Sequence, residues 1–167
     1  SKELEDFYKK FGSLNLNIDN ISKLPSLKGI NNKIYIFENP SLLNYFKNQN
    51  ISIIITSGIP NLSFYHLLEK IDENTALYYN GDFDPEGLLI ANKLKLLYPK
   101  INLICYNQKD YFSTNPSEIL NSSRLKKLEH IKVPELKEIK SLILETNKSG
   151  YQENNLKNIE NNIKYTT

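Results

Sequence analysis

The chain has 167 residues, a mass of 19.4 kDa, 21 basic and 19 acidic side chains, and a single cysteine. This length suits a domain that buries roughly 70% of the surface of its unfolded form without help from disulfides. The net charge of +2 is too small to indicate nucleic-acid binding by itself, so any basic surface has to be local.

The expected absence of targeting signals and the use of cysteine both predict a cytoplasmic protein. Cys105 lies in the apolar run of residues 101–106, which favours a buried structural thiol over a nucleophile. The longest apolar runs have the length of strands and the start of the chain is charged, so we expect neither a membrane span nor a signal peptide. The chain begins with Ser1 and contains no methionine, which predicts a piece of a longer protein with a further N-terminal part.

The first 30 residues are predicted to form an N-terminal helix and a linker. Apolar residues at helical spacing predict the helix over residues 2–11. Residues 13–28 alternate weakly, which predicts a linker with some edge-strand pairing. We therefore expect residues 1–30 to precede the main domain, which spans residues 31–167.

Strand-like and helix-like segments alternate through the first part of the main domain. The expected strands span residues 33–38, 51–58 with its turn, 76–79 and 100–106. The expected helices between them span residues 41–46, 60–71 and 85–97. This order with short connections predicts an α/β fold in which a four-stranded parallel, Rossmann-like sheet is sandwiched by helices.

A helical extension is predicted to follow the sheet. Residues 107–116 are polar and are expected to form a loop. Apolar spacing then predicts three further helices, over residues 118–130, 134–146 and 151–163.

Acidic side chains stand at the ends of the first and third predicted strands. The carboxyl ends of parallel strands share one edge of a sheet, which is where ligands bind. Glu38 ends the first strand, and Asp82 and Asp84 follow the third. Residues two apart on an extended backbone project to the same side, so both aspartates can face one Mg²⁺ with oxygen ligands at about 2.0–2.1 Å.

The alternative interpretation of Asp84 is that it only caps the helix that follows. Three acids at strand ends are hard to explain by stability alone, so the pattern favours a catalytic metal site made of Glu38, Asp82 and Asp84.

Three residues are predicted to shape the turns beside these acids. Pro85 suits the first helical position because it has no N–H to leave unpaired, and Gly87 allows close backbone approach. Gly58 follows the second strand, where a tight turn and proximity to a phosphate explain a glycine equally well.

The best candidates for contacts with DNA phosphates are Arg124, Lys126 and Lys127. A solvated helix face explains this cluster about as well. His66 and His130 have no paired ligand spacing, so surface or core-edge positions are favoured over zinc ligation.

The acids and the glycine turn together resemble the Toprim domain, the metal-binding catalytic module of topoisomerases, bacterial-type primases and several nucleases. Within that group, residues 56–60 and 82–87 are similar to the A subunit of type IIB topoisomerases and the related meiotic double-strand-break protein. The chain also resembles the C-terminal domain of the nuclease subunit of Wadjet-type SMC anti-plasmid systems. The segments that carry this last resemblance are residues 14–22, 37–41, 56–58, 79–84 and 151–153.

The resemblance implies a site and an activity. It implies Mg²⁺ or Mn²⁺ held by Glu38, Asp82 and Asp84, with Glu38 also handling protons and Glu153 as a weaker fourth acid. It further implies metal-dependent cleavage of double-stranded DNA, by a larger protein that works with an SMC-type complex against plasmid DNA. A divalent ion suits this chemistry, because it stabilises charge on the phosphate and on the leaving oxygen.

One departure from the topoisomerases leaves alternatives open. Their catalytic tyrosine comes from a separate winged-helix-like domain, and none of the 11 tyrosines here stands in a context that singles it out. Hydrolysis and transesterification, activity of the chain alone, the DNA feature recognised and a homodimer all stay open. The alternative function is a non-catalytic module that docks DNA or a partner. A phosphatase that uses Asp-x-Asp is less favoured, because its nucleophilic aspartate usually follows the first strand.

Overall fold

A computed structural model of the chain describes Asp6, Lys10 and residues 12–166. Apart from Asp6 and Lys10, the helix expected over residues 2–11 lies outside the described residues. None of the described helices is both long and apolar enough to cross a membrane.

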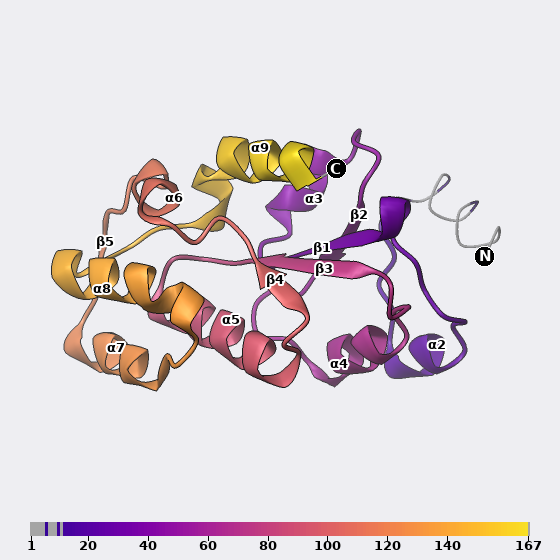
Figure 1. Ribbon diagram of the computed structural model, residues 1–167, viewed down its shortest axis with the longest axis horizontal. Coiled ribbons are helices and arrows are strands. Elements are labelled where there is room, and N and C mark those ends of the chain that lie inside the picture. The colour runs from indigo at the N-terminus through magenta and orange to yellow at the C-terminus, as the bar shows by residue number, and fades with distance from the viewer. Residues whose placement is uncertain (1–5, 7–9, 11, 167) are drawn as a thin grey trace.

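A four-stranded parallel sheet lies at the centre of the molecule, with its strands in the order β2-β1-β3-β4 (Figure 1). The pairing of β1 with β3 places Phe37 opposite Asn80, so these two strands end side by side. The predicted α/β, Rossmann-like fold is therefore confirmed. The strands are β1 (Lys33–Phe37), β2 (Ser52–Ile55), β3 (Ala76–Asn80) and β4 (Ile101–Leu103).

Helices cover both faces of the sheet. Tyr35 and Phe37 of β1 point to one face, whereas Ile34 and Ile36 point to the other, as the two-residue period of a strand requires. The first face packs against α3 and α9, and the second packs against α4 and α5 (Figure 1). These helices are α3 (Ser41–Phe46), α4 (Leu62–Glu69), α5 (Pro85–Leu97) and α9 (Leu156–Thr166).

The predicted linker has structure of its own. It contains a short helix, α2 (Ile18–Ser22), which packs against α4, and a 3₁₀ turn, η1 (Ile30–Asn32). Leu27 forms a parallel bridge with Ile71, so the expected edge pairing is present as a single bridge. The linker is thereby attached to the same face of the sheet as α4.

Two predictions for the C-terminal extension were wrong in detail. Residues 107–116 are not a plain loop, because Asn107 and Asp110 form a capping box that starts α6 (Gln108–Ser113). Residues 118–130 are not one helix, because Asn121 caps a new helix and the residues before it pair as a strand. The elements are β5 (Glu118–Ile119), α7 (Ser122–Lys126) and the 3₁₀ turn η2 (Lys127–His130).

The rest of the extension follows the prediction more closely. Each of the last two predicted helices begins with a 3₁₀ turn. The elements are η3 (Pro134–Leu136), α8 (Lys137–Thr146), β6 (Lys148–Ser149) and η4 (Gln152–Asn154), followed by α9. Figure 1 shows α6, α7 and α8 gathered beyond one end of the sheet.

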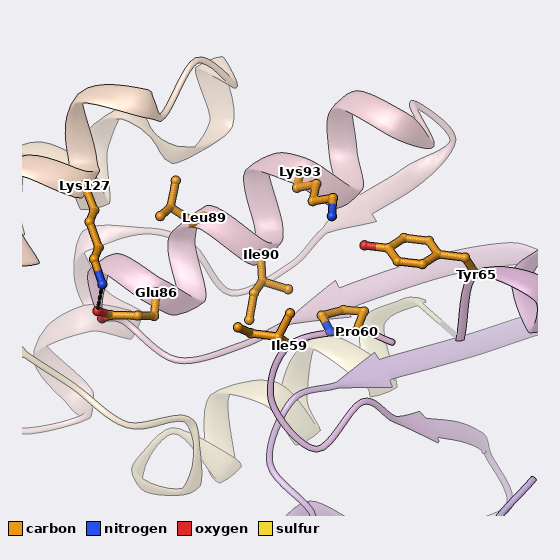
Figure 2. Close-up of a pocket in the computed structure, with 8 residues that line it drawn as sticks. All are labelled: Ile59, Pro60, Tyr65, Glu86, Leu89, Ile90, Lys93 and Lys127. Carbon is orange, nitrogen blue, oxygen red and sulfur yellow. Dashed lines mark hydrogen bonds and ion pairs between the residues drawn. The ribbon is translucent and has the colours of Figure 1, made fainter. Parts of the chain in front are cut away.

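An open cavity of about 340 Å³ lies between the turn before α4 and the outer side of α5 (Figure 2). Ile59 and Pro60 line one side, and Leu89 and Ile90 of α5 line the other. The ion pair between Glu86 and Lys127 lies at one end of this largely apolar cavity.

Gly87 in the first turn of α5 has no room for a side chain. A Cβ at this position would lie 2.5 Å from the backbone oxygen of Asp82, closer than any van der Waals contact. We expect Gly87→Ala to lower the free energy of unfolding by about 1–3 kcal/mol, because the helix or the acidic loop has to move. Urea denaturation measures this change.

The control for this substitution is Leu96→Ala, at a position on the same helix that is 55% exposed. It should change the free energy of unfolding by about 0.5 kcal/mol or less. An unchanged denaturation midpoint for Gly87→Ala would contradict the close approach of α5 to the acidic loop.

Candidate functional site

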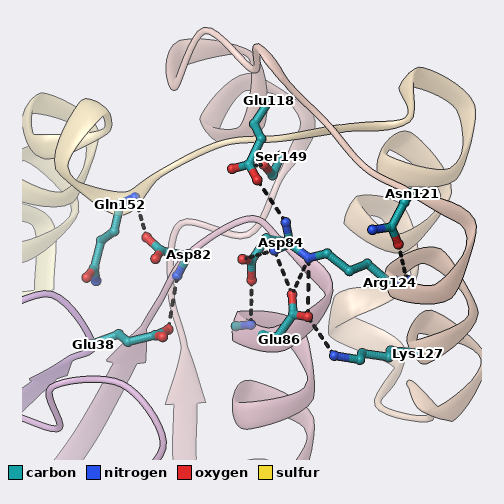
Figure 3. Close-up of polar contacts among 11 residues, drawn as sticks. Glu38, Asp82, Asp84, Glu86, Glu118, Asn121, Arg124, Lys127, Ser149 and Gln152 are labelled. Atoms are coloured by element: carbon teal, nitrogen blue, oxygen red, sulfur yellow. Dashed lines mark hydrogen bonds and ion pairs between the residues drawn. The ribbon is translucent and has the colours of Figure 1, made fainter.

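The carboxyl ends of β1 and β3 carry the predicted acids (Figure 3). Glu38 follows β1, and its Oε2 accepts a hydrogen bond of 3.3 Å from the backbone N–H of Asp82, 44 positions further along the chain. The structure therefore brings Glu38 and the start of the Asp-x-Asp segment together, as the sheet order predicts.

Gly81 provides the space in which the Glu38 side chain lies. A Cβ on Gly81 would be 2.7 Å from Glu38 Oε2 and 2.7 Å from the hydroxyl of Tyr79. The backbone N–H of Gly81 donates to the hydroxyl of Tyr106 at 2.8 Å. No role was assigned to Gly81 or to either tyrosine from the sequence, although a glycine directly before two acids was a signal for close packing.

Asp82 is held by the segment that leads into the last helix. The backbone N–H of Gln152 donates to Asp82 Oδ1 at 2.7 Å. The fully buried side chain of Gln152 donates to the backbone and side-chain oxygens of Asn80, at 2.8 and 2.9 Å, and accepts from the Asn39 N–H. Gln152 thus joins the ends of β1 and β3, a role that no local pattern in the sequence indicated.

The same segment also pairs with the backbone between the two aspartates. Phe83 and Gly150 exchange two backbone hydrogen bonds, of 2.9 and 3.1 Å, in an isolated antiparallel bridge. The acidic loop is therefore fixed from the C-terminal side of the chain as well as by its own strand.

Glu153, the predicted fourth acid, lies nearby but is exposed. Its Oε2 accepts a hydrogen bond of 2.6 Å from the side-chain amide of Asn39. Its charge is one of the influences that raise the pKa of Asp82.

Asp84 is bonded to α5 and α7. One carboxylate oxygen accepts from the Gly87 N–H at 2.7 Å, which makes Asp84 the N-cap of α5 and Pro85 its first residue. The other oxygen accepts from Arg124 at 2.7 Å. The capping role considered as the alternative is therefore present, together with an ion pair.

Arg124 forms ion pairs with three carboxylates (Figure 3). Besides Asp84, its guanidinium contacts Glu86 at 2.7 Å and Glu118 at 3.0 Å. Lys127 adds a second cation on Glu86, also at 2.7 Å. Within the described part of the chain, no three His, Cys, Asp or Glu side chains are arranged to hold a metal ion.

The two halves of the site differ in their electrostatics. Burial, reinforced by the nearby charge of Asp82, raises the pKa of Glu38 to about 7. Burial likewise raises the pKa of Asp82 to about 6, against the opposing hydrogen bond from Gln152. Burial also acts on Glu86, but hydrogen bonds from Arg124 and Lys127 outweigh it and hold that pKa at about 2.

Basic partners, rather than pKa shifts, divide the acids into two groups, because burial raises the pKa of Asp84 as well. Asp84 and Glu86 have basic partners, whereas Glu38 and Asp82 form no ion pair with any described Lys, Arg or His side chain. A buried carboxylate without a counter-charge is costly unless it is protonated or binds a cation. The pair Glu38 and Asp82 is therefore the part of the site that fits an added cation.

The predicted phosphate contacts lie on α7 and at the start of η2. Arg124 and Lys127 are bonded to carboxylates of the site, and Lys126 is exposed. A role for these three residues in binding DNA stays a prediction. Gly58, in the turn after β2, has φ +90° with nothing near its Cβ position, so its backbone conformation rather than crowding favours glycine.

A protein family described as "Protein of unknown function C-terminus (DUF2399)" matches residues 14–163, which include every acid of the site. No curated protein matches the chain.

The raised pKa of Glu38 predicts how stability depends on pH without divalent cations. Between about pH 4.5 and pH 7 the folded protein holds a proton on Glu38 that the unfolded chain releases. We therefore expect the stabilisation from Glu38 to be complete below this window and to be lost as the pH rises through it. Urea denaturation in the presence of a chelator, at several pH values, measures this loss.

Glu38→Gln is the reference for that measurement. Asp82 and Asp84 have pKa values shifted in the same direction, and they contribute to both proteins. The difference between wild type and Glu38→Gln therefore isolates Glu38. Parallel profiles of stability against pH in the two proteins would contradict the raised pKa.

Proposed function

The chain belongs to the family described as "Protein of unknown function C-terminus (DUF2399)", and on that premise we propose that it is a Toprim-type domain for metal-dependent cleavage of double-stranded DNA. The observation that carries the proposal is the pair Glu38 and Asp82, two half-buried carboxylates at adjacent strand ends without a basic partner among the described residues. Ligands of parallel α/β sheets bind at this edge.

The charge around the strand ends supports a cation as the first ligand. Six carboxylates lie at or beside this edge, and two basic side chains are bonded to three of them. The carboxylates therefore outnumber the bases that pair with them, which favours a divalent cation over a phosphate as the first ligand. The carboxylates are those of Glu38, Asp82, Asp84, Glu86, Glu118 and Glu153, and the bases are Arg124 and Lys127.

Glu38 and Asp82 would hold Mg²⁺ or Mn²⁺ directly, because carboxylate oxygens are the ligands that these hard cations prefer. Asp84 and Glu153 are further candidate ligands, although one oxygen of Asp84 is bonded to Arg124 and one oxygen of Glu153 is bonded to Asn39. When bound, the cation supplies charge stabilisation to the phosphate and to the leaving oxygen.

The residues around the cation have separate tasks in this proposal. The Gln152 N–H orients Asp82, and the Asp82 N–H orients Glu38. The resemblance assigns Glu38 a part in proton handling as well. Arg124 keeps a positive charge beside the position where a phosphate would approach.

The biological setting comes from the resemblance to the nuclease subunit of Wadjet-type SMC anti-plasmid systems. We propose that the chain forms the catalytic end of a larger protein that works with an SMC-type complex against plasmid DNA. A homodimer is compatible with this setting.

A second candidate function is a non-catalytic module that docks DNA or a partner protein. The ion pair between Arg124 and Asp84 favours it, because Arg124 already neutralises a carboxylate that the nuclease would use. A docking module keeps the fold and the acidic edge without the chemistry, so activity separates the two candidates.

Calorimetric titration of the chain with Mn²⁺ tests the cation site. We expect saturable binding, and we expect Asp82→Asn to weaken it by at least about tenfold because a direct ligand is lost. Glu69→Gln, which removes an exposed acid on α4, is the matched control and should leave the affinity unchanged. A wild-type chain that binds neither Mn²⁺ nor Mg²⁺ would remove the basis of the proposal.

Plasmid cleavage by the full-length protein, with its partner complex present, tests the catalytic step. Glu38→Gln and Asp84→Asn should each lower the rate by about a hundredfold or more, because the charge on the transition state loses its support. Glu69→Gln again serves as the control. Cation binding without any cleavage would favour the docking module.

A further inference from the structure

The hydroxyl of Tyr79 is buried without a hydrogen-bond partner. The residue lies on β3 with no exposed surface, and its hydroxyl forms no hydrogen bond with any described residue. Leaving a buried hydroxyl unpaired costs free energy, and such groups usually have a partner in the functional state of a protein. Packing alone does not explain the hydroxyl, because phenylalanine would fill the same space.

This hydroxyl faces the same space as the Glu38 carboxylate. Each of them comes within 2.7 Å of the position that a Cβ of Gly81 would occupy. The neighbouring hydroxyl of Tyr106 already accepts the Gly81 N–H, so it has a partner. Tyr79 is therefore the phenol beside Glu38 whose hydroxyl has no partner at all among the described residues.

The hydrogen-bonding capacities of the two groups are complementary. An ionised carboxylate accepts about four hydrogen bonds, whereas Glu38 accepts one from the described part of the chain, at 3.3 Å from the Asp82 N–H. A phenol donates one. A rotation of the Glu38 side chain within the space above Gly81 would join the donor and the acceptor.

We propose that Tyr79 is a positioning residue for the cation site: its hydroxyl donates to one oxygen of Glu38 and thereby directs the other oxygen to the divalent cation. The inference rests on the proposed function, because it assigns a task within the same site. Groups that hydrogen-bond to metal ligands commonly fix the orientation of those ligands in this way.

The test is Tyr79→Phe, measured in two states of the chain. Without a divalent cation, the melting temperature of Tyr79→Phe should equal or exceed that of wild type, because the substitution removes an unpaired hydroxyl. With Mn²⁺ alone as the probe, the dissociation constant from calorimetry should rise about tenfold. A residue that only packs would not produce both results.

Tyr78→Phe is the matched control. Tyr78 is the preceding residue of β3, on the opposite face of the sheet, where its ring stacks on Tyr35. Tyr78→Phe should leave Mn²⁺ affinity unchanged. In a double-mutant cycle, Tyr79→Phe should have no further effect on Mn²⁺ affinity once Glu38→Gln is present.

The outcomes separate this inference from the proposed function. If wild type binds Mn²⁺ and Tyr79→Phe binds it equally well, the role of Tyr79 is overturned and the cation site stands. A lower melting temperature of Tyr79→Phe in a chelator also overturns it, because the hydroxyl would then act in the cation-free fold. If wild type binds no divalent cation, the proposed function fails and this inference fails with it.

Discussion

The parallel pairing of β1 with β3 is the constraint from which the site follows. Phe37 lies opposite Asn80, so the residues that leave the two strands emerge side by side. Glu38 and Asp82, 44 positions apart, are neighbours only for this reason. Both strands have partners on each side in the sheet, and a shift of register would turn buried side chains toward the wrong face. The register that packs the core of the sheet therefore also fixes the positions of the acids.

Burial then gives neighbouring carboxylates different properties. Asp84 lies against α5 and α7 and is paired with Arg124, which completes its interactions within the protein. Glu38 and Asp82 are half-buried and have no basic partner among the described residues. Burial raises their pKa values to about 7 and about 6, and it raises the pKa of Asp84 as well. The protein has thus left one pair of carboxylates dependent on a proton or a cation from outside. Both candidate functions start from this pair, and they differ in whether chemistry follows.

The accuracy of the sequence predictions varied with how local the governing signals are. The helix over residues 85–97 was predicted with both bounds, because a cap, a proline at the first position and an apolar period all coincide there. The region after β4 was predicted less well. Asn107 begins a short helix that the apolar pattern did not show, and Asn121 begins a helix that the pattern had predicted to start at residue 118.

The sequence by itself determined the order of the strands and helices that build the central sheet, the acids at the strand ends and the turn residues beside them. Periodicity and capping, which indicate these features, are properties of neighbouring residues. The tertiary structure alone decided which acids are neutralised. Arg124 reaches Asp84 across 40 positions, and Gln152 reaches Asp82 across 70. The sequence likewise gives no indication that the hydroxyl of Tyr79 lacks a partner among the described residues. Such partners depend on how distant segments pack, and no local pattern of residues records that packing.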